Sequence, residues 1–395
     1  MLWSTSLLSR RWRDATAAFG AVGFILLSAP VESATKSSIP AEVLVLLQKR
    51  LLVDAEVLAP GSGKLASRMQ LVAKASADDI AQRYLRRRAA SQSAPKPGGV
   101  AFSAPEFWAW YTNQAALVLV NLDTFQKADY LQATVNSGPT PSGKTCMAMS
   151  EELRVLPEEG TERARRWEAV LALQLRRIGL EESAPPRPSS SYSELASAAA
   201  MAELVRPGAG EPLPAGVVRL LRGKLRAGSN EEEEWNCELS KWMERRILSD
   251  PPRFKAELDA FIYETMDAQM EVIFDTLATQ RDAFKGAPDG VPLAAYVFGV
   301  QGSVQVEATV GADGKAVEAT VVKRTVKVPG LLGAPPIGFE RLFDAAAIDH
   351  AMSRDHRPLL ADRSLGQRVI YEINWKPDEA GPQPTPTHAR SGKPS

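Results

Sequence analysis

The sequence contains few of the residues on which enzyme chemistry usually depends. Its 395 residues include only 3 histidines and 2 cysteines. Neither the Gly-x-Ser-x-Gly motif of serine hydrolases nor the His-Glu-x-x-His motif of zinc proteases occurs. We therefore predict that the protein is not an enzyme, and we assign it no catalytic residue, cofactor or metal site.

The sequence also lacks an excess of charge of either sign. Its 47 basic and 47 acidic side chains cancel, so no overall field attracts nucleic acid or an anionic membrane. The hydrophobic fraction of 45% and the charged fraction of 24% are ordinary for a globular protein. The length allows roughly two or three domains.

Long hydrophobic runs are scarce, and the most prominent one lies near the N-terminus. Three arginines at positions 10–13 precede an apolar run over Ala15–Pro30, and small residues follow. This order is typical of a secretory signal peptide, and the run is short for a membrane span of about 20 residues. We predict that residues 1–34 are a signal peptide and that the protein is periplasmic. The alternative is an uncleaved anchor in the inner membrane, with the chain facing the periplasm.

The two cysteines, Cys146 and Cys237, could form a disulfide in an oxidising compartment. Such a bond would close a loop of about ninety residues and contribute about 4 kcal/mol in the chain-entropy model. The sequence alone does not show that the two residues lie within reach of each other.

Residues 35–285 predict a helical domain with Pro, Gly and Ser in its loops. Ser76 with Asp79, and Ser191 with Glu194, resemble capping boxes that begin helices. Asp250 is expected to cap the last long helix. Further helices are predicted at about 162–178, 192–206, 215–226 and 231–248.

Two tryptophans and two histidines carry specific expectations. Trp108 and Trp110 are two residues apart on a predicted helix, so they do not share one face. Core packing is the expected role of both, and exposure of one at an interface is the alternative. His350 and His356 are six residues apart, on different helix faces, which disfavours a metal site. Both histidines are expected to cap or solvate a helix end.

The pattern changes to strands after Gly286. Alternating apolar residues predict strands over 303–310 and 316–325, joined by a turn that ends at Gly314. A short helix over 343–352 and a last strand over 367–375 follow. The polar, proline-rich tail, residues 377–395, is expected to be disordered.

This order of elements resembles the TonB C-terminal domain family over residues 290–376. The matching segments are Pro292–Ala295, Gly299–Val304, the hairpin Val306–Val317, the helix start Phe343–Ile348, His356–Pro358 and the closing strand Arg368–Trp375. The family likeness implies a small domain that binds envelope proteins or an extended peptide by strand addition. The closing strand would then present Arg368, Ile370, Glu372 and Asn374 to a partner.

The chain departs from the family in two ways. A Pro/Gly-rich insertion, Pro329–Gly338, separates the second strand from the helix. A helical domain of about 250 residues stands where the family's energy transducers carry a long spacer. We therefore interpret the domain as a protein-binding module, with TonB-type transport and envelope maintenance as its two candidate roles.

One motif favours a different function. Residues 138–145 match the P-loop pattern, with Gly138, Gly143, Lys144 and Thr145 at its defining positions. In that motif, backbone N–H groups and the lysine bind nucleotide phosphates. The segment follows no buried strand, so the match is weak, but a P-loop nucleotide-binding protein stays an alternative. A second alternative is a periplasmic enzyme hidden in the helical domain, which would need a cleft with two facing carboxylates.

The sequence thus predicts an α+β protein: an N-terminal all-α domain followed by a small domain with an antiparallel sheet of about three strands. The proposed role is that of an exported interaction protein.

Overall fold

The computed structural model describes most of the chain from Gly63 onward. The described residues are 45, 63–91, 104–135, 143–148, 160–208, 210–226, 228–279, 281, 284, 287, 291–311, 313–356, 368–375 and 383–389. The expected signal peptide, residues 1–34, and Gly138 of the P-loop pattern lie outside them.

The chain divides into two compact units, which we describe separately. The helical unit holds the described residues up to Arg83 and those from Gln114 to Val272. The sheet unit holds Tyr84–Asn113 and the described residues from Ile273 onward. The mixed α+β class that the sequence predicts is therefore confirmed, although the units do not divide at residues 285–290.

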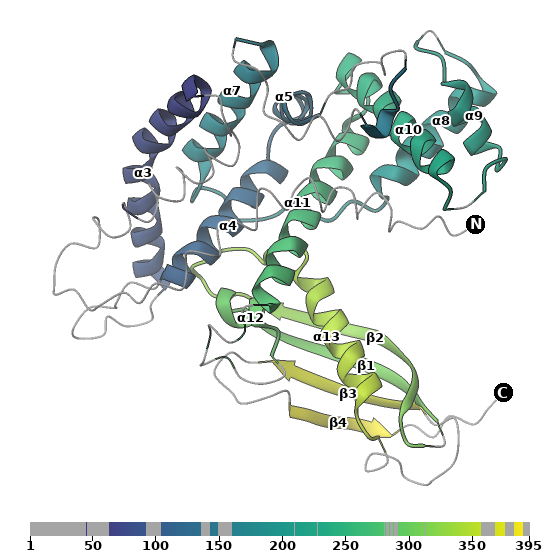
Figure 1. The fold of residues 1–395 in the computed structure, drawn as a ribbon. Coiled ribbons are helices and arrows are strands. Elements are labelled where there is room, and N and C mark those ends of the chain that lie inside the picture. Colours follow the sequence, from purple (N-terminus) through teal and green to yellow (C-terminus); the bar gives the residue numbers. More distant parts are fainter. Residues whose placement is uncertain are drawn as a thin grey trace. The chain divides into compact units, whose positions relative to one another are not determined.

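Helices precede the sheet in the chain, as Figure 1 shows. They are α3 (Gly63–Ser91), α4 (Ala104–Val120), α5 (Thr124–Thr134), α7 (Glu162–Arg177), α8 (Tyr192–Val205), α9 (Ala215–Leu221), α10 (Asn230–Ser249) and α11 (Lys255–Ala278). The elements of the sheet unit follow as α12 (Leu293–Phe298), β1 (Gln301–Val310), β2 (Ala316–Lys327), α13 (Phe339–Ser353), β3 (Arg368–Trp375) and β4 (Gln383–Ala389).

Helix starts were predicted with mixed success. Ser191 and Glu194 form the expected capping box at the start of α8. Ser76 does not begin a helix: α3 runs through it, and its hydroxyl donates to the Val72 carbonyl one turn earlier. Asp250 ends α10 instead of capping α11, and four turn residues separate it from Lys255.

The sheet has strand order β2-β1-β3-β4, and all its pairs are antiparallel. The three expected strands are present, and Gly314 has the positive φ of +82° that the hairpin turn requires. The expectation of a wholly disordered tail was wrong, because Gln383–Ala389 pairs with β3 as β4. Pro384 and Pro386 are two residues apart, so their backbone nitrogens lie on the same side of β4. Proline has no N–H to donate, and a strand at the edge of a sheet tolerates its absence.

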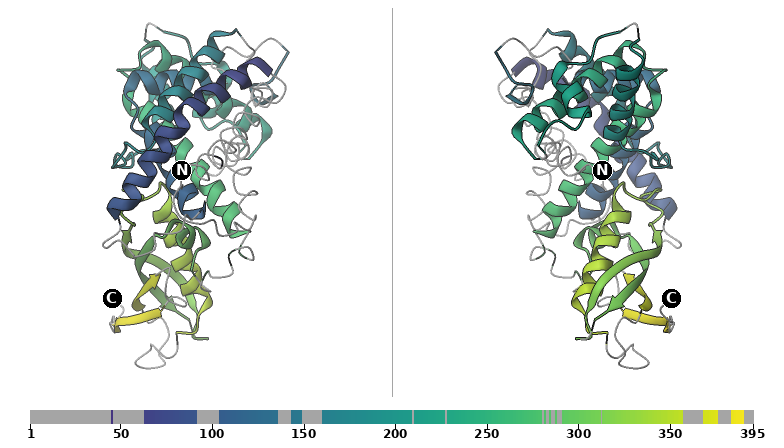
Figure 2. Two further views of the ribbon diagram at one scale, coloured as in Figure 1. Left: turned by 90° about the vertical axis from the view of Figure 1, so that its left-hand side faces the viewer. Right: turned by 90° about the vertical axis from the view of Figure 1, so that its right-hand side faces the viewer.

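Helix α13 packs on one face of the sheet, as Figures 1 and 2 show. Residues of β1 alternate strictly between buried and half-buried, and the buried set faces the helix. At Gly302, a β-carbon would lie 2.7 Å from the Phe343 ring, so only glycine lets the helix approach this closely. Phe343 in turn lies 5.5 Å from the Trp375 ring on β3.

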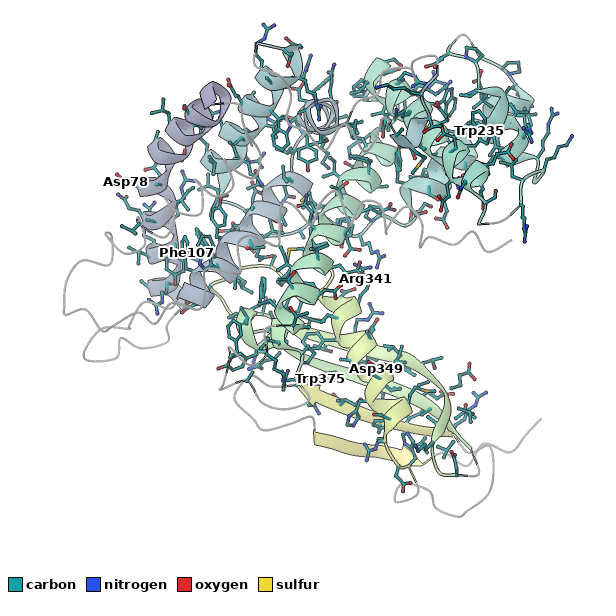
Figure 3. The ribbon with its side chains drawn as sticks, in the orientation of Figure 1. Asp78, Phe107, Trp235, Arg341, Asp349 and Trp375 are labelled. Carbon is teal, nitrogen blue, oxygen red and sulfur yellow. A yellow bond between two sulfur atoms is a disulfide. The ribbon has the colours of Figure 1, made fainter. Side chains whose placement is uncertain are left out.

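The sheet unit is larger than residues 290–376 because helical residues complete its core. Aromatic side chains of α3 and α4, labelled at Phe107 in Figure 3, pack together: Tyr84, Phe107, Trp108, Trp110 and Tyr111. Both tryptophans are buried, at 8% and 0% exposure, which confirms core packing for both and excludes the alternative that one is exposed. Neighbouring aromatic rings cover both sides of this helix turn, which the helix periodicity alone could not show.

The Pro/Gly-rich insertion is part of this core. The side-chain amide of Asn113 donates to the carbonyls of Leu332 and Ala334, at 3.4 and 3.0 Å. Leu331, Leu332 and Ile337 are buried. The insertion, which follows β2, is therefore tied to the middle of α4.

Candidate functional site

The sheet has an open face, opposite α13, which we define as the outward side chains of β1 and β3. In β3, the residues that sequence analysis singled out, Arg368, Ile370, Glu372 and Asn374, alternate with buried Val369, Tyr371, Ile373 and Trp375. All four are half-buried or exposed. The structure therefore brings the predicted partner-binding residues onto one surface.

Cross-strand partners complete the open face. Ser303, Gln305 and Glu307 of β1 lie opposite Asn374, Glu372 and Ile370. The Arg368 guanidinium pairs with the Glu307 carboxylate at 2.9 Å, and the Ser303 hydroxyl donates to Glu372. The face is thus flat, polar and nearly neutral, with Ile370 as its apolar centre.

The edge of β3 differs from expectation. β3 pairs with β1 on one side and with β4 on the other, so its backbone is not free for a partner strand. The described sheet has two outer edges, β4 and β2. In β2, Val317 and Val322 are bulge residues without an opposite residue in β1. Bulges and cationic residues such as Lys323 and Lys327 are typical of edges protected from strand addition. Addition to β3 therefore requires that β4 leaves.

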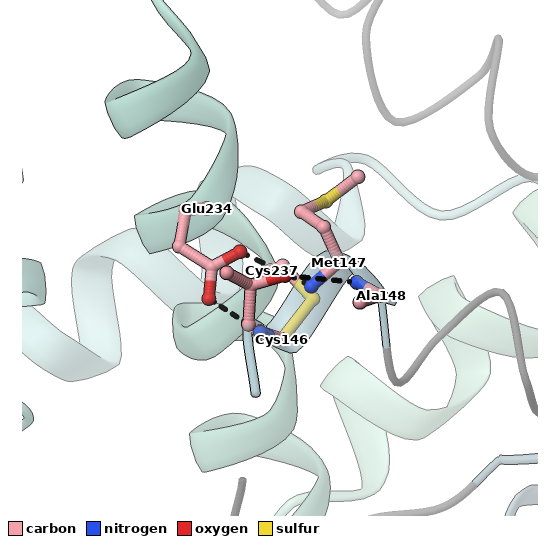
Figure 4. The surroundings of a disulfide bond; sticks show 6 residues. Cys146, Met147, Ala148, Glu234 and Cys237 are labelled. Atoms are coloured by element: carbon pink, nitrogen blue, oxygen red, sulfur yellow. Dashed lines mark hydrogen bonds between the residues drawn. A yellow bond between two sulfur atoms is a disulfide. The ribbon is translucent and has the colours of Figure 1, made fainter. Parts of the chain in front are cut away.

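The described part of the P-loop pattern has another structural role. The Thr145 hydroxyl accepts a hydrogen bond from Ala148 N–H at 3.1 Å and caps a short turn. The carboxylate of Glu234, on α10, accepts from the N–H groups of Cys146 and Met147 (Figure 4). A side-chain carboxylate therefore occupies the backbone donors that follow Lys144 and Thr145. The described sheet is antiparallel, whereas the P-loop belongs to parallel sheets.

Cys146 and Cys237 form a disulfide, with their Cα atoms 6.0 Å apart. Cys237 lies three residues after Glu234 on α10, so the two side chains are neighbours on the helix surface. The disulfide and the two hydrogen bonds of Glu234 therefore start from the same turn of α10. Cys146 is fully buried. This covalent link joins the 143–148 segment to α10 within the helical unit.

The helical unit contains a shallow cavity of about 290 Å³ between α5 and α7. Its floor is apolar, and Asp129 and Glu162 face it from the two helices. Arg166 pairs with both carboxylates, at 3.4 Å from Glu162. Because both acids are bound to one arginine, this cavity does not present the free acid and base that a glycoside hydrolase requires.

Sequence analysis missed a buried polar group on α10. Lys241 and Glu244 are 4% and 6% exposed, and the Lys241 ammonium has no hydrogen-bond partner among the residues that the structure describes. Burial raises the pKa of Glu244 to about 8, although Lys241 and Arg245 oppose this. Burial and the charge of Glu244 also raise the pKa of nearby Tyr192. A charged pair three residues apart on a helix usually indicates a solvated face, so the pattern gave no signal of burial.

Of the two roles predicted for the histidines, capping or solvation of a helix end, His356 has the first, because its ring bonds a carbonyl in the last turn of α13. It is fully buried, its Nε2 lies 2.7 Å from the Ala351 carbonyl, and its backbone N–H donates to Gly314. It therefore connects the end of α13 to the β1–β2 hairpin. Burial and the Arg354 charge lower the pKa values of His350 and His356.

In the residues that the structure describes, no group of three acidic, histidine or cysteine side chains is placed to hold a metal ion. None of the described helices combines the length and hydropathy that a bilayer span requires. Comparison with known protein families, curated proteins and solved structures gives no match.

Proposed function

We propose that the protein is an exported cell-envelope protein that binds other proteins through the open face of its sheet unit. The observation that carries this proposal is the flat surface of β1 and β3, on which Arg368, Ile370, Glu372 and Asn374 lie together. A flat polar surface with one apolar centre suits recognition of another protein better than capture of a small molecule, which needs a concave pocket.

Two further observations support the proposal. The order β1, β2, α13, β3 and the hairpin turn at Gly314 agree with the likeness to the TonB C-terminal family. The disulfide between Cys146 and Cys237 favours an oxidising compartment such as the periplasm. In this proposal the protein acts as a binding module, and not as an energy transducer or a nucleotide hydrolase.

The partner is proposed to contact side chains of the open face first. Ile370 would be its apolar anchor, and Arg368 and Glu372 would fix its orientation. A partner strand could pair with β3 only after β4 is released. Strand addition would therefore be a second step of binding.

Affinity capture from a cell-envelope extract tests this proposal. The wild-type chain is compared with Ile370→Glu, which alters the centre of the open face, and with Glu182→Arg, an exposed position of the helical unit. We expect the wild type and Glu182→Arg to capture the same protein and Ile370→Glu to lose it. Capture by all three, or recovery of the protein from cytosol by fractionation, would overturn the proposal.

A further inference from the structure

Helix α8 has an exposed apolar face. Its buried side, Tyr192, Ala196 and Ala200, packs within the helical unit. The opposite side is exposed and consists of Glu194, Ala198, Met201, Ala202 and Val205. Met201 and Val205 are 42% and 71% exposed.

The spacing of these residues places them on one side of the helix. Intervals of three and four residues follow the helical repeat from Ala198 to Val205. A single exposed apolar side chain is ordinary, but here no polar residue interrupts the face after Glu194. Such a continuous apolar face is typical of a surface that another protein covers.

The ends of this face carry opposite charges. Glu194 lies at the N-terminal end, where one carboxylate oxygen accepts the Ser191 N–H. Arg206 follows the last helical residue and is exposed. Neither side chain forms an ion pair within the described part of the chain. Their separation of twelve positions in the sequence corresponds to about 18 Å along a helix.

We propose that this face binds the α8 face of a second copy of the chain, with the two helices antiparallel. A two-fold axis at the level of Ala200 places Glu194 level with Arg206 of the second copy, and Ala198 level with Ala202 of the second copy. A parallel arrangement would instead place like charges together. The small alanine side chains at the centre allow the helix axes to approach closely.

One pair of helices buries less surface than the roughly 800 Å² per partner of a stable complex. The dimer is therefore expected to be weak and to form reversibly as the concentration rises. This inference concerns the helical unit and does not depend on the function proposed for the sheet unit.

Sedimentation equilibrium of the full chain, at concentrations up to about 1 mM, tests the surface. Val205→Glu places a charge on the face, and Leu180→Glu is the matched control, since Leu180 is 58% exposed in the same unit but outside α8. We expect the wild type and Leu180→Glu to dimerise and Val205→Glu to stay monomeric. A wild type that is monomeric throughout, or a Val205→Glu variant that dimerises equally well, overturns the proposal.

Charge reversal tests the antiparallel arrangement. Arg206→Glu and Glu194→Arg should each weaken self-association roughly fivefold to tenfold, because two attractive pairs become repulsive. An equimolar mixture of the two variants should dimerise again, since both pairs are then attractive. Lack of recovery in the mixture overturns the antiparallel pairing.

Discussion

The Oε2 atom of Glu234 lies 3.1 Å from the backbone nitrogen of Met147, from which it accepts a hydrogen bond. The same carboxylate accepts from Cys146 N–H, and Cys146 is bonded to Cys237 one helical turn after Glu234. The two residues that directly follow the P-loop match are thus held by a protein carboxylate. We expect the wild type and Lys144→Ala to show the same nucleotide binding, because Glu234 already accepts hydrogen bonds from the backbone N–H groups of the neighbouring residues.

Removal of the Glu234 carboxylate should destabilise the helical unit. Glu234→Ala leaves two backbone N–H groups without their acceptor, and we expect a loss of about 1–3 kcal/mol in urea unfolding. Glu234→Gln keeps one acceptor oxygen and should lose less. Equal losses in the two variants would show that packing, rather than hydrogen bonding, gives Glu234 its effect.

The disulfide should contribute substantially to stability. The sequence separation of its cysteines is 91 residues, for which the chain-entropy model gives about 4–5 kcal/mol. Denaturant unfolding with and without reductant measures this contribution. The double variant Cys146→Ser/Cys237→Ser is the control, and its unfolding should not respond to reductant. A wild-type free energy of unfolding that is the same with and without reductant would contradict the prediction.

Mild acid should destabilise the sheet unit through His356. The pKa of this buried imidazole is lowered from 6.5, so the unfolded chain binds more protons than the folded chain below about that pH. The contribution of His356 to the free energy of unfolding should then be constant above pH 6.5 and fall as the pH drops further. His350 contributes with the same sign.

Unfolding at pH 5 to 8 measures this dependence. His356→Gln should reduce the loss of stability in acid. A difference in the free energy of unfolding between the wild type and His356→Gln that does not change as the pH falls from 6.5 to 5 would contradict the assignment.

Glu244 should act with the opposite sign. Its pKa is 4.5 in the reference state and about 8 in the folded chain, so the folded chain holds an extra proton between these values. Stability then falls as the pH rises from about 4.5 to 8. Glu244→Gln keeps a neutral side chain of the same shape and should be more stable than the wild type at pH 8, with a smaller difference at pH 5. Glu182→Gln, at an exposed position, should show no such trend.

The tail strand should compete with an added peptide. Deletion of residues 377–395 removes β4 and exposes the backbone of β3. A labelled peptide with the sequence of residues 383–389 should then bind the shortened chain and not the full chain, as fluorescence anisotropy can show. Equal binding to both chains would mean that β4 does not occupy this edge.

Local patterns predicted much of the fold. The alternation in β1, the turn at Gly314 and the capping box of Ser191 with Glu194 each depend on neighbouring residues, and each was found. The unit boundary was not predictable in the same way. It depends on long-range contacts such as those between Asn113 and the 332–334 carbonyls, 219 and 221 residues apart in the chain.

The side chains of the candidate site could be predicted from the sequence, but the strand that pairs with the edge of β3 could not. Period-two alternation correctly placed Arg368, Ile370, Glu372 and Asn374 on one face. The pairing of Gln383–Ala389 with β3 could not be expected, because prolines and polar residues usually disfavour strands. The burial of Lys241, Glu244 and His356 was missed for a similar reason: their types favour solvent, and only the packed helices show otherwise.

Site-specific photocrosslinking in intact cells tests the central claim most directly. A photoreactive residue is placed at Ile370 or Asn374 on the open face, and at Glu182 in the helical unit as the control. The account predicts a crosslinked envelope protein of one size from both open-face positions and none from Glu182. The absence of any product at Ile370 and Asn374, or the same product at Glu182, would contradict it.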